Sequence, residues 1–225
     1  MIKNGLNQPL CFCGYHMDDA ALVNVASGGL ATSIAENIVS KGGVVYGVIH
    51  SEAFHGAEYT RAEKIADLLP IRGSKYVDVK PVCEGKSVYE MVLADLQENR
   101  VVLFVGLPCM VAAMVRRAEK AMVAENLITL DLICHGPTSP LVAKEYAEMM
   151  AQKHGSKVTD LTVRYKKNGK WTPRYHMQME VLQWNRLLRQ SMVLRSVFWL
   201  PIDAIHVNSK GVTICQILRL GIIGG

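Results

Sequence analysis

The chain of 225 residues has a hydrophobic fraction of 50%, a mean hydropathy of +0.15 and a formal net charge of +5. These values exclude a disordered or low-complexity protein and allow one large α/β domain or two small ones, with a core of normal size. Residues 181–225 carry a net charge of +4 out of the total of +5, so the rest of the chain does not predict a nucleic-acid-binding surface.

Cysteine content and hydropathy predict a cytoplasmic protein. Six cysteines are too few for a disulfide-stabilised scaffold of this length, and the chain does not open on a signal-peptide pattern. The longest uncharged stretch, residues 101–115, contains Gly-Leu-Pro-Cys and is too short to cross a bilayer. We therefore expect no membrane span and no nucleic-acid partner.

Helix and strand patterns alternate along the chain. Apolar residues at helical spacing predict helices over residues 27–41, 58–69, 87–99, 110–121 and 140–154. Compact apolar runs predict strands at residues 44–49 and 101–106 and at the start of residues 127–136, and residues 72–79 predict a loop entering a short strand. Residues 158–167 and 175–181 predict an antiparallel pair around a turn at 168–170. The predicted fold class is α/β, a largely parallel sheet flanked by helices with a small antiparallel annex.

Two loops have the composition of a phosphate site. Ser27, Gly28 and Gly29 precede the first helix, where bare backbone N–H groups carry partial positive charge and glycines allow a ligand to approach. The alternative is an ordinary helix cap made by Ser27, with the glycines forming the turn.

The second loop is Arg72-Gly73-Ser74-Lys75-Tyr76. Its two cations suit a cofactor phosphate, and its tyrosine suits stacking on an aromatic ring. The alternative is a solvated turn before a strand.

Two cysteines follow apolar strands, where open α/β sheets bind ligands. Cys109 also precedes a helix, whose N-terminus favours the thiolate form, and Cys134 is followed by His135. If the two strands are neighbours, the thiolates converge and suit an iron–sulfur cluster, while His135 suits a proton donor. Two other interpretations remain: both cysteines are structural, or Cys109 is a transferase nucleophile with His135 as its base.

The other cysteines give weaker signals. Cys11 and Cys13 are too closely spaced to chelate well and suggest packing, and Cys83 is expected to be incidental. The sequence contains no Cys-x-x-Cys pair and no Gly-x-Gly-x-x-Gly, which argues against a zinc ribbon and a Rossmann dinucleotide site.

Five blocks occur together in a characteristic order: SGGLATSIAE, KGGVVYGV, RGSKYV, VLFVGLPCMVAAM and LDLICHGPTSP. In this combination, from about Cys11 to about Glu180, the sequence resembles the beta subunit family of coenzyme F420-reducing hydrogenases and dehydrogenases. The resemblance implies FAD and a 4Fe-4S cluster in an α/β flavin domain that passes electrons to a two-electron acceptor.

By matched position, the resemblance makes the residues of the two phosphate-like loops flavin-site candidates, Cys109 and Cys134 cluster ligands, and His135 a catalytic candidate. It also implies an external electron donor, either a ferredoxin-like protein or a hydrogenase or dehydrogenase subunit, because the ferredoxin module of many members does not precede the flavin domain here. The acceptor is F420 or a related small molecule.

The sequence after Glu180 departs from the family pattern. Arginines interrupt every apolar face, and a shifted reading of permitted codons for the last twelve residues spells a family-like Asp-Ile-Thr-Ile-Gly-Asp-Tyr-Trp-Gly. We therefore expect residues 1–180 to form the flavin-binding domain and residues 181–225 to be a frame-shifted, poorly ordered tail in which Cys215 has no role. This leaves a second functional interpretation, a non-catalytic binding or assembly subunit that has lost its cluster.

Overall fold

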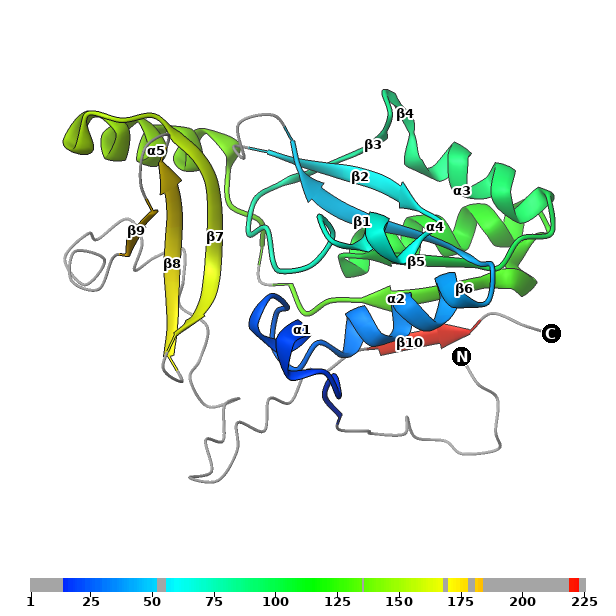
Figure 1. Ribbon diagram of the computed structural model, residues 1–225. Coiled ribbons are helices and arrows are strands. Elements are labelled where there is room, and N and C mark those ends of the chain that lie inside the picture. The colour runs from blue at the N-terminus through cyan, green and yellow to red at the C-terminus, as the bar shows by residue number, and fades with distance from the viewer. Residues whose placement is uncertain are drawn as a thin grey trace.

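The computed structural model describes residues 14–51, 56–134, 136–167, 170–177, 181–183 and 219–222. Within these residues the chain forms a seven-stranded sheet with helices on both faces and a separate three-stranded sheet (Figure 1). The helices are α1 (Asp19–Val23), α2 (Leu30–Ser40), α3 (Val88–Gln97), α4 (Pro108–Lys120) and α5 (Pro140–His154), with short 3-10 helices η2 (Ile65–Leu68) and η3 (Ala124–Asn126).

The large sheet contains strands from both ends of the described chain. They are β1 (Val44–His50), β2 (Ala57–Ala62), β3 (Val79–Cys83), β4 (Lys86–Ser87), β5 (Val102–Gly106), β6 (Leu127–Asp131) and β10 (Arg219–Ile222), in the order β10-β6-β5-β1-β2-β3-β4. The central strands β6, β5 and β1 are parallel, and β2 also pairs parallel to β3. The antiparallel pairs are β1 with β2, β6 with β10, and β3 with β4.

The small sheet is the predicted annex. Strands β7 (Val158–Lys167), β8 (Lys170–Met177) and β9 (Val181–Gln183) pair antiparallel in that order, and α5 packs against β7. Helix α5 ends at Gly155, which takes the left-handed conformation with φ 62°. The annex lies on the side of the large sheet where its parallel strands end (Figure 1). These features confirm the predicted α/β class.

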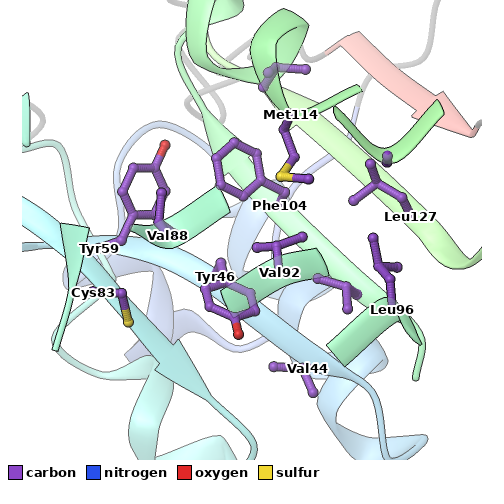
Figure 2. Close-up of a cluster of buried hydrophobic side chains, with 13 residues drawn as sticks. Val44, Tyr46, Tyr59, Cys83, Val88, Val92, Leu96, Phe104, Met114 and Leu127 are labelled. Carbon is purple, nitrogen blue, oxygen red and sulfur yellow. The ribbon is translucent and has the colours of Figure 1, made fainter. Parts of the chain in front are cut away.

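Alternation along the strands divides the core into two layers. Val44 and Tyr46 of β1 pack toward α3 and α4, whereas Val45 packs toward α2 and η2. Figure 2 shows the α3 and α4 layer, in which Phe104 of β5 lies close to Met114 of α4. Both faces of the central strands are buried, which explains their continuous apolar runs.

One predicted helix is wrong. Residues 58–69 do not form a helix: they contribute most of β2 and then η2. The strand places Tyr59 and Ala62 in the core and pairs with β1 along its whole length. This pairing satisfies the backbone of an element whose alternation of charged and apolar residues is also compatible with a helix.

An ion-pair cluster with a buried carboxylate at its centre lies between α3 and strands β1 and β2. Asp95 of α3 is 6% exposed, and its Oδ2 accepts hydrogen bonds from the Tyr46 hydroxyl (2.6 Å) and Arg61 Nε (2.9 Å). Arg61 Nη2 donates to Oδ1 (2.8 Å), and Arg100 joins the cluster through Glu63. Burial raises the pKa of Asp95, but the hydrogen bonds from Arg61 and Tyr46 outweigh it and hold that pKa below its ordinary value.

A membrane-spanning helix needs about 20 predominantly apolar residues, and α5, the longest helix in the part of the chain that the structure describes, has 15. Within that part of the chain, no helix combines the length and the apolar composition that a membrane crossing requires.

Candidate functional site

Four loops meet where the parallel strands end. Helix α2 leads into β1, so the loop before α2 lies at the carboxyl end of that strand (Figure 1). The loops after β5 and β6 start side by side, because Leu132 donates its backbone N–H to Gly106 O (3.0 Å). The loop of residues 72–78 reaches the same edge, where the Asp78 N–H donates to Thr138 O (2.9 Å). The structure therefore brings together the segments that carry the predicted site residues.

The loop before α2 is shaped by close packing. Ser27 and Gly29 have φ values of 51° and 75°, and Gly28 and Gly29 are buried. A Cβ on Gly29 would lie 2.8 Å from Val25 Cγ2, and the His16 N–H donates to Gly28 O (2.7 Å). Gly29, not Ser27, is the N-cap residue, and it leaves the first helical N–H groups without a side-chain cap. The alternative interpretation of this loop, an ordinary helix cap made by Ser27, is therefore wrong.

The loop of residues 72–76 is organised by its own lysine. Lys75 Nζ donates to four carbonyls, those of Pro70 (2.8 Å), Ile71 (3.0 Å), Arg72 (2.8 Å) and Gly73 (3.3 Å). Gly73 (φ 79°) is exposed, and a Cβ there would meet no atom of the described residues within 4 Å. The half-buried Ser74 and Tyr76 follow, the tyrosine with φ 52°. Lys75 thus directs its charge into the loop, and Gly73 leaves an open approach to the backbone.

Arg72 is held by a carboxylate from α2. Arg72 Nη2 donates to Glu36 Oε1 (2.8 Å), and His16 Nε2 lies 3.0 Å from Glu36 Oε2. The Arg72 side chain is 16% exposed, and its buried Nε has no hydrogen-bond partner among the described residues. An unpaired buried donor is costly unless a ligand or water accepts from it.

The two candidate cluster ligands are both exposed. Cys109 is the second residue of α4, and Cys134 lies in the loop after β6, where its sulfur accepts from the Gly136 N–H (3.3 Å). Cys83 is buried in β3, and burial raises the pKa of its thiol. The described residues contain no group of three His, Cys, Asp or Glu side chains that could hold a metal ion.

An aromatic group backs the loop after β5. Tyr59 stacks on Phe104 with ring centroids 5.1 Å apart, and its hydroxyl lies 3.5 Å from Met110 Sδ. A Cβ on Gly106 would lie 2.6 Å from that hydroxyl. Burial raises the pKa of Tyr59, so the hydroxyl stays protonated at neutral pH.

One predicted site residue and three other cysteines are not placed. His135, Cys11, Cys13 and Cys215 lie outside the described residues, so the proton-donor role of His135 stays a prediction. Sequence reasoning missed His16, Glu36 and Tyr59. Glu36 stood inside one of the five characteristic blocks, but its partners are 20 and 36 residues away.

Comparisons with known proteins agree with the sequence resemblance. Residues 99–195 match the family model for the C terminus of the coenzyme F420 hydrogenase/dehydrogenase beta subunit, and the match extends past the expected boundary at Glu180. A chain of the xenon-derivatised F420-reducing [NiFe] hydrogenase complex from Methanosarcina barkeri has a similar fold, with a TM-score of 0.51 and 19% identity over 74% of this chain. The similarity spans 57% of that hydrogenase chain. No curated protein matches the sequence.

Proposed function

The chain belongs, over residues 99–195, to the coenzyme F420 hydrogenase/dehydrogenase beta subunit family, and on this premise we propose that it is a flavin-dependent oxidoreductase subunit. It would pass electrons between an iron–sulfur centre and a two-electron acceptor such as F420. An external ferredoxin-like, hydrogenase or dehydrogenase subunit would supply the electrons in the cytoplasm. The solved relative belongs to a hydrogenase complex, which supports a partner subunit.

The convergence of four loops at the carboxyl edge of the parallel strands carries the proposal. Open α/β sheets bind their ligands at this edge. The hydrogen bond between Asp78 and Thr138 links the cationic loop to the loop after β6, and the ion pair between Arg72 and Glu36 links it to α2.

The described residues fit the anionic part of FAD. Arg72 has a buried N–H donor left to give, Gly73 leaves its backbone approachable, and the first N–H groups of α2 have no side-chain cap. We propose that these groups bind the diphosphate and that Ser74 and Tyr76 contact the remainder of the cofactor. FAD supplies the exchange between one-electron and two-electron transfer, and the protein supplies position and exclusion of water.

The described residues do not by themselves fit a 4Fe-4S cluster. Such a cluster takes four thiolates, and these loops provide Cys109 and Cys134. We keep these two as proposed ligands and derive no step through a cluster.

The proposal is tested by anaerobic incubation with FAD, iron and sulfide, followed by desalting and a visible spectrum. Retained flavin bands that weaken in Arg72→Gln support the flavin site, and a broad iron–sulfur shoulder that weakens in Cys109→Ser supports the cluster. Flavin without the shoulder keeps the flavin site and removes the cluster. A colourless protein with an intact far-ultraviolet circular dichroism spectrum would overturn the proposal in favour of the non-catalytic subunit.

A further inference from the structure

Glu36 joins three segments that are far apart in the sequence. Its carboxylate accepts from Arg72 of the cationic loop on Oε1 (2.8 Å) and contacts His16 Nε2 on Oε2 (3.0 Å). The side chains are partly shielded from water, with exposures of 25% for Glu36, 16% for Arg72 and 12% for His16. Charge-assisted hydrogen bonds in such an environment are stronger than those on an open surface.

The hydrogen-bond pattern requires an acceptor at both oxygens of Glu36. The Asp18 backbone N–H donates to His16 Nδ1 (3.1 Å), so Nδ1 carries no proton and Nε2 is the donor. Arg72 can only donate. A carboxylate accepts from both groups at once, whereas the amide of a glutamine offers an acceptor to one and a donor to the other.

The same contacts fix the direction of the Arg72 guanidinium. Lys75 holds the loop backbone from inside, and the Arg72 carbonyl is one of its four acceptors. Glu36 accepts a hydrogen bond from Arg72 Nη2, while the buried Arg72 Nε has no partner within the described part of the chain. The guanidinium is therefore oriented before a ligand arrives, which lowers the entropy lost on binding.

We propose that Glu36 is a positioning residue that orients Arg72 to bind the diphosphate of FAD. Glu36 acts through Arg72, because its own negative charge would repel a diphosphate. This inference rests on the proposed function and adds to it a residue that holds the phosphate-binding group.

The test measures binding of three probes by purified protein: FAD, riboflavin, which has no phosphate, and inorganic pyrophosphate. The variants are Glu36→Gln, Arg72→Gln and the double variant, with Glu90→Gln on the exposed side of α3 as the matched control. We expect each single variant to weaken FAD and pyrophosphate binding about 10- to 100-fold, as for loss of a charge-assisted hydrogen bond. Riboflavin affinity should change less than about twofold.

The double variant separates positioning from a general structural role. If Glu36 acts through Arg72, adding Glu36→Gln to Arg72→Gln has little further effect. Glu36→Asp keeps two acceptor oxygens and should recover part of the affinity, which also covers the case in which Glu36→Gln does not fold.

Three results would overturn the inference: FAD affinity unchanged in Glu36→Gln, equal losses for FAD and riboflavin, or single effects that add in the double variant. If the natural protein binds pyrophosphate in a Glu36-dependent way but no FAD, positioning stands and the flavin proposal fails. If it binds neither, both fail.

Discussion

The two faces of the large sheet each contain an arginine–carboxylate cluster, and the clusters differ in how completely they are paired. On the α3 face, the Asp95 side chain is 8% exposed and accepts from both Tyr46 and Arg61. On the α2 face, Glu36 is 25% exposed, and its partner Arg72 keeps a buried N–H without an acceptor among the described residues.

This difference separates a stabilising cluster from one suited to a ligand. Every group around Asp95 has a partner, so removing the Asp95 carboxylate leaves the partly buried Arg61 with Glu63, which is more exposed, as its ion-pair partner. In the Glu36 cluster the carboxylate side chain is more exposed than that of Asp95 (25% against 8%) and Arg72 has a donor remaining, so its loss should affect binding more than folding.

The largest expected effect is on the fully paired cluster. Asp95→Ala should lower the free energy of unfolding by about 3–5 kcal/mol, because Arg61 is left charged and partly buried. Glu36→Gln should lower it by about 1 kcal/mol or less. Urea denaturation of both variants measures the contrast, and equal losses would show that the two clusters do not differ in this way.

Glycine substitutions compare packing with open space at the site. Gly29→Ala should cost about 1–3 kcal/mol of unfolding free energy, because its φ is 75° and the new Cβ would lie 2.8 Å from Val25 Cγ2. Gly73→Ala shares the positive φ of 79° but meets no atom within 4 Å among the described residues, so it should cost about 1–2 kcal/mol. Denaturant unfolding curves with equal m-values would measure the loss of unfolding free energy in each variant. A larger loss in Gly73→Ala than in Gly29→Ala would contradict the prediction.

Most of the fold could be predicted because apolar patterns mark its core. The strands at residues 44–50 and 102–106 are buried on both faces and stood out as continuous apolar runs. Residues 58–69 were wrongly predicted to form a helix, because β2 depends on its pairing with β1, which is a tertiary contact that the local pattern does not reveal. That error also hid the Asp95 cluster, since Arg61 reaches Asp95 from a strand.

The candidate site was predictable only in part. Strand-end positions and glycines indicated the loops that converge, because these signals are local. Glu36 and His16 were missed because their contact depends on how separate segments pack. Lys75 looked like a phosphate ligand because composition does not reveal where an ammonium group points, and in the structure it binds the carbonyls of its own loop.

Stability at the extremes of pH should depend on the α3 face. The pKa of Asp95 lies below its ordinary value of 3.8, so its contribution is present above about pH 4 and lost as the pH falls through the folded pKa. Burial and the adjacent Asp95 raise the pKa of Tyr46 above 10.0, so the contribution of its neutral form is lost as the pH rises beyond about 10.

Unfolding free energies of Asp95→Asn should vary less at acid pH than those of the natural protein, and those of Tyr46→Phe should vary less at alkaline pH. If the unfolding free energies of both variants depend on pH as those of the natural protein do, the pH dependence comes from groups elsewhere in the molecule.

The smallest expected effect on stability is at Lys75. In Lys75→Met the apolar stem remains and water can reach the exposed carbonyls of the loop, so the unfolding free energy should fall by less than about 1 kcal/mol. The backbone should nevertheless loosen locally, with faster amide hydrogen exchange at Asp78, which donates to Thr138. FAD should bind more weakly because Arg72 loses its fixed backbone, and added salt should change the affinities of the variant and the natural protein in parallel.

A variant with unchanged hydrogen exchange and a much weaker salt dependence of FAD binding would instead show that the ammonium group of Lys75 binds the phosphate directly. That result would return Lys75 to the role its composition first suggested and leave Glu36 alone as the group that orients Arg72.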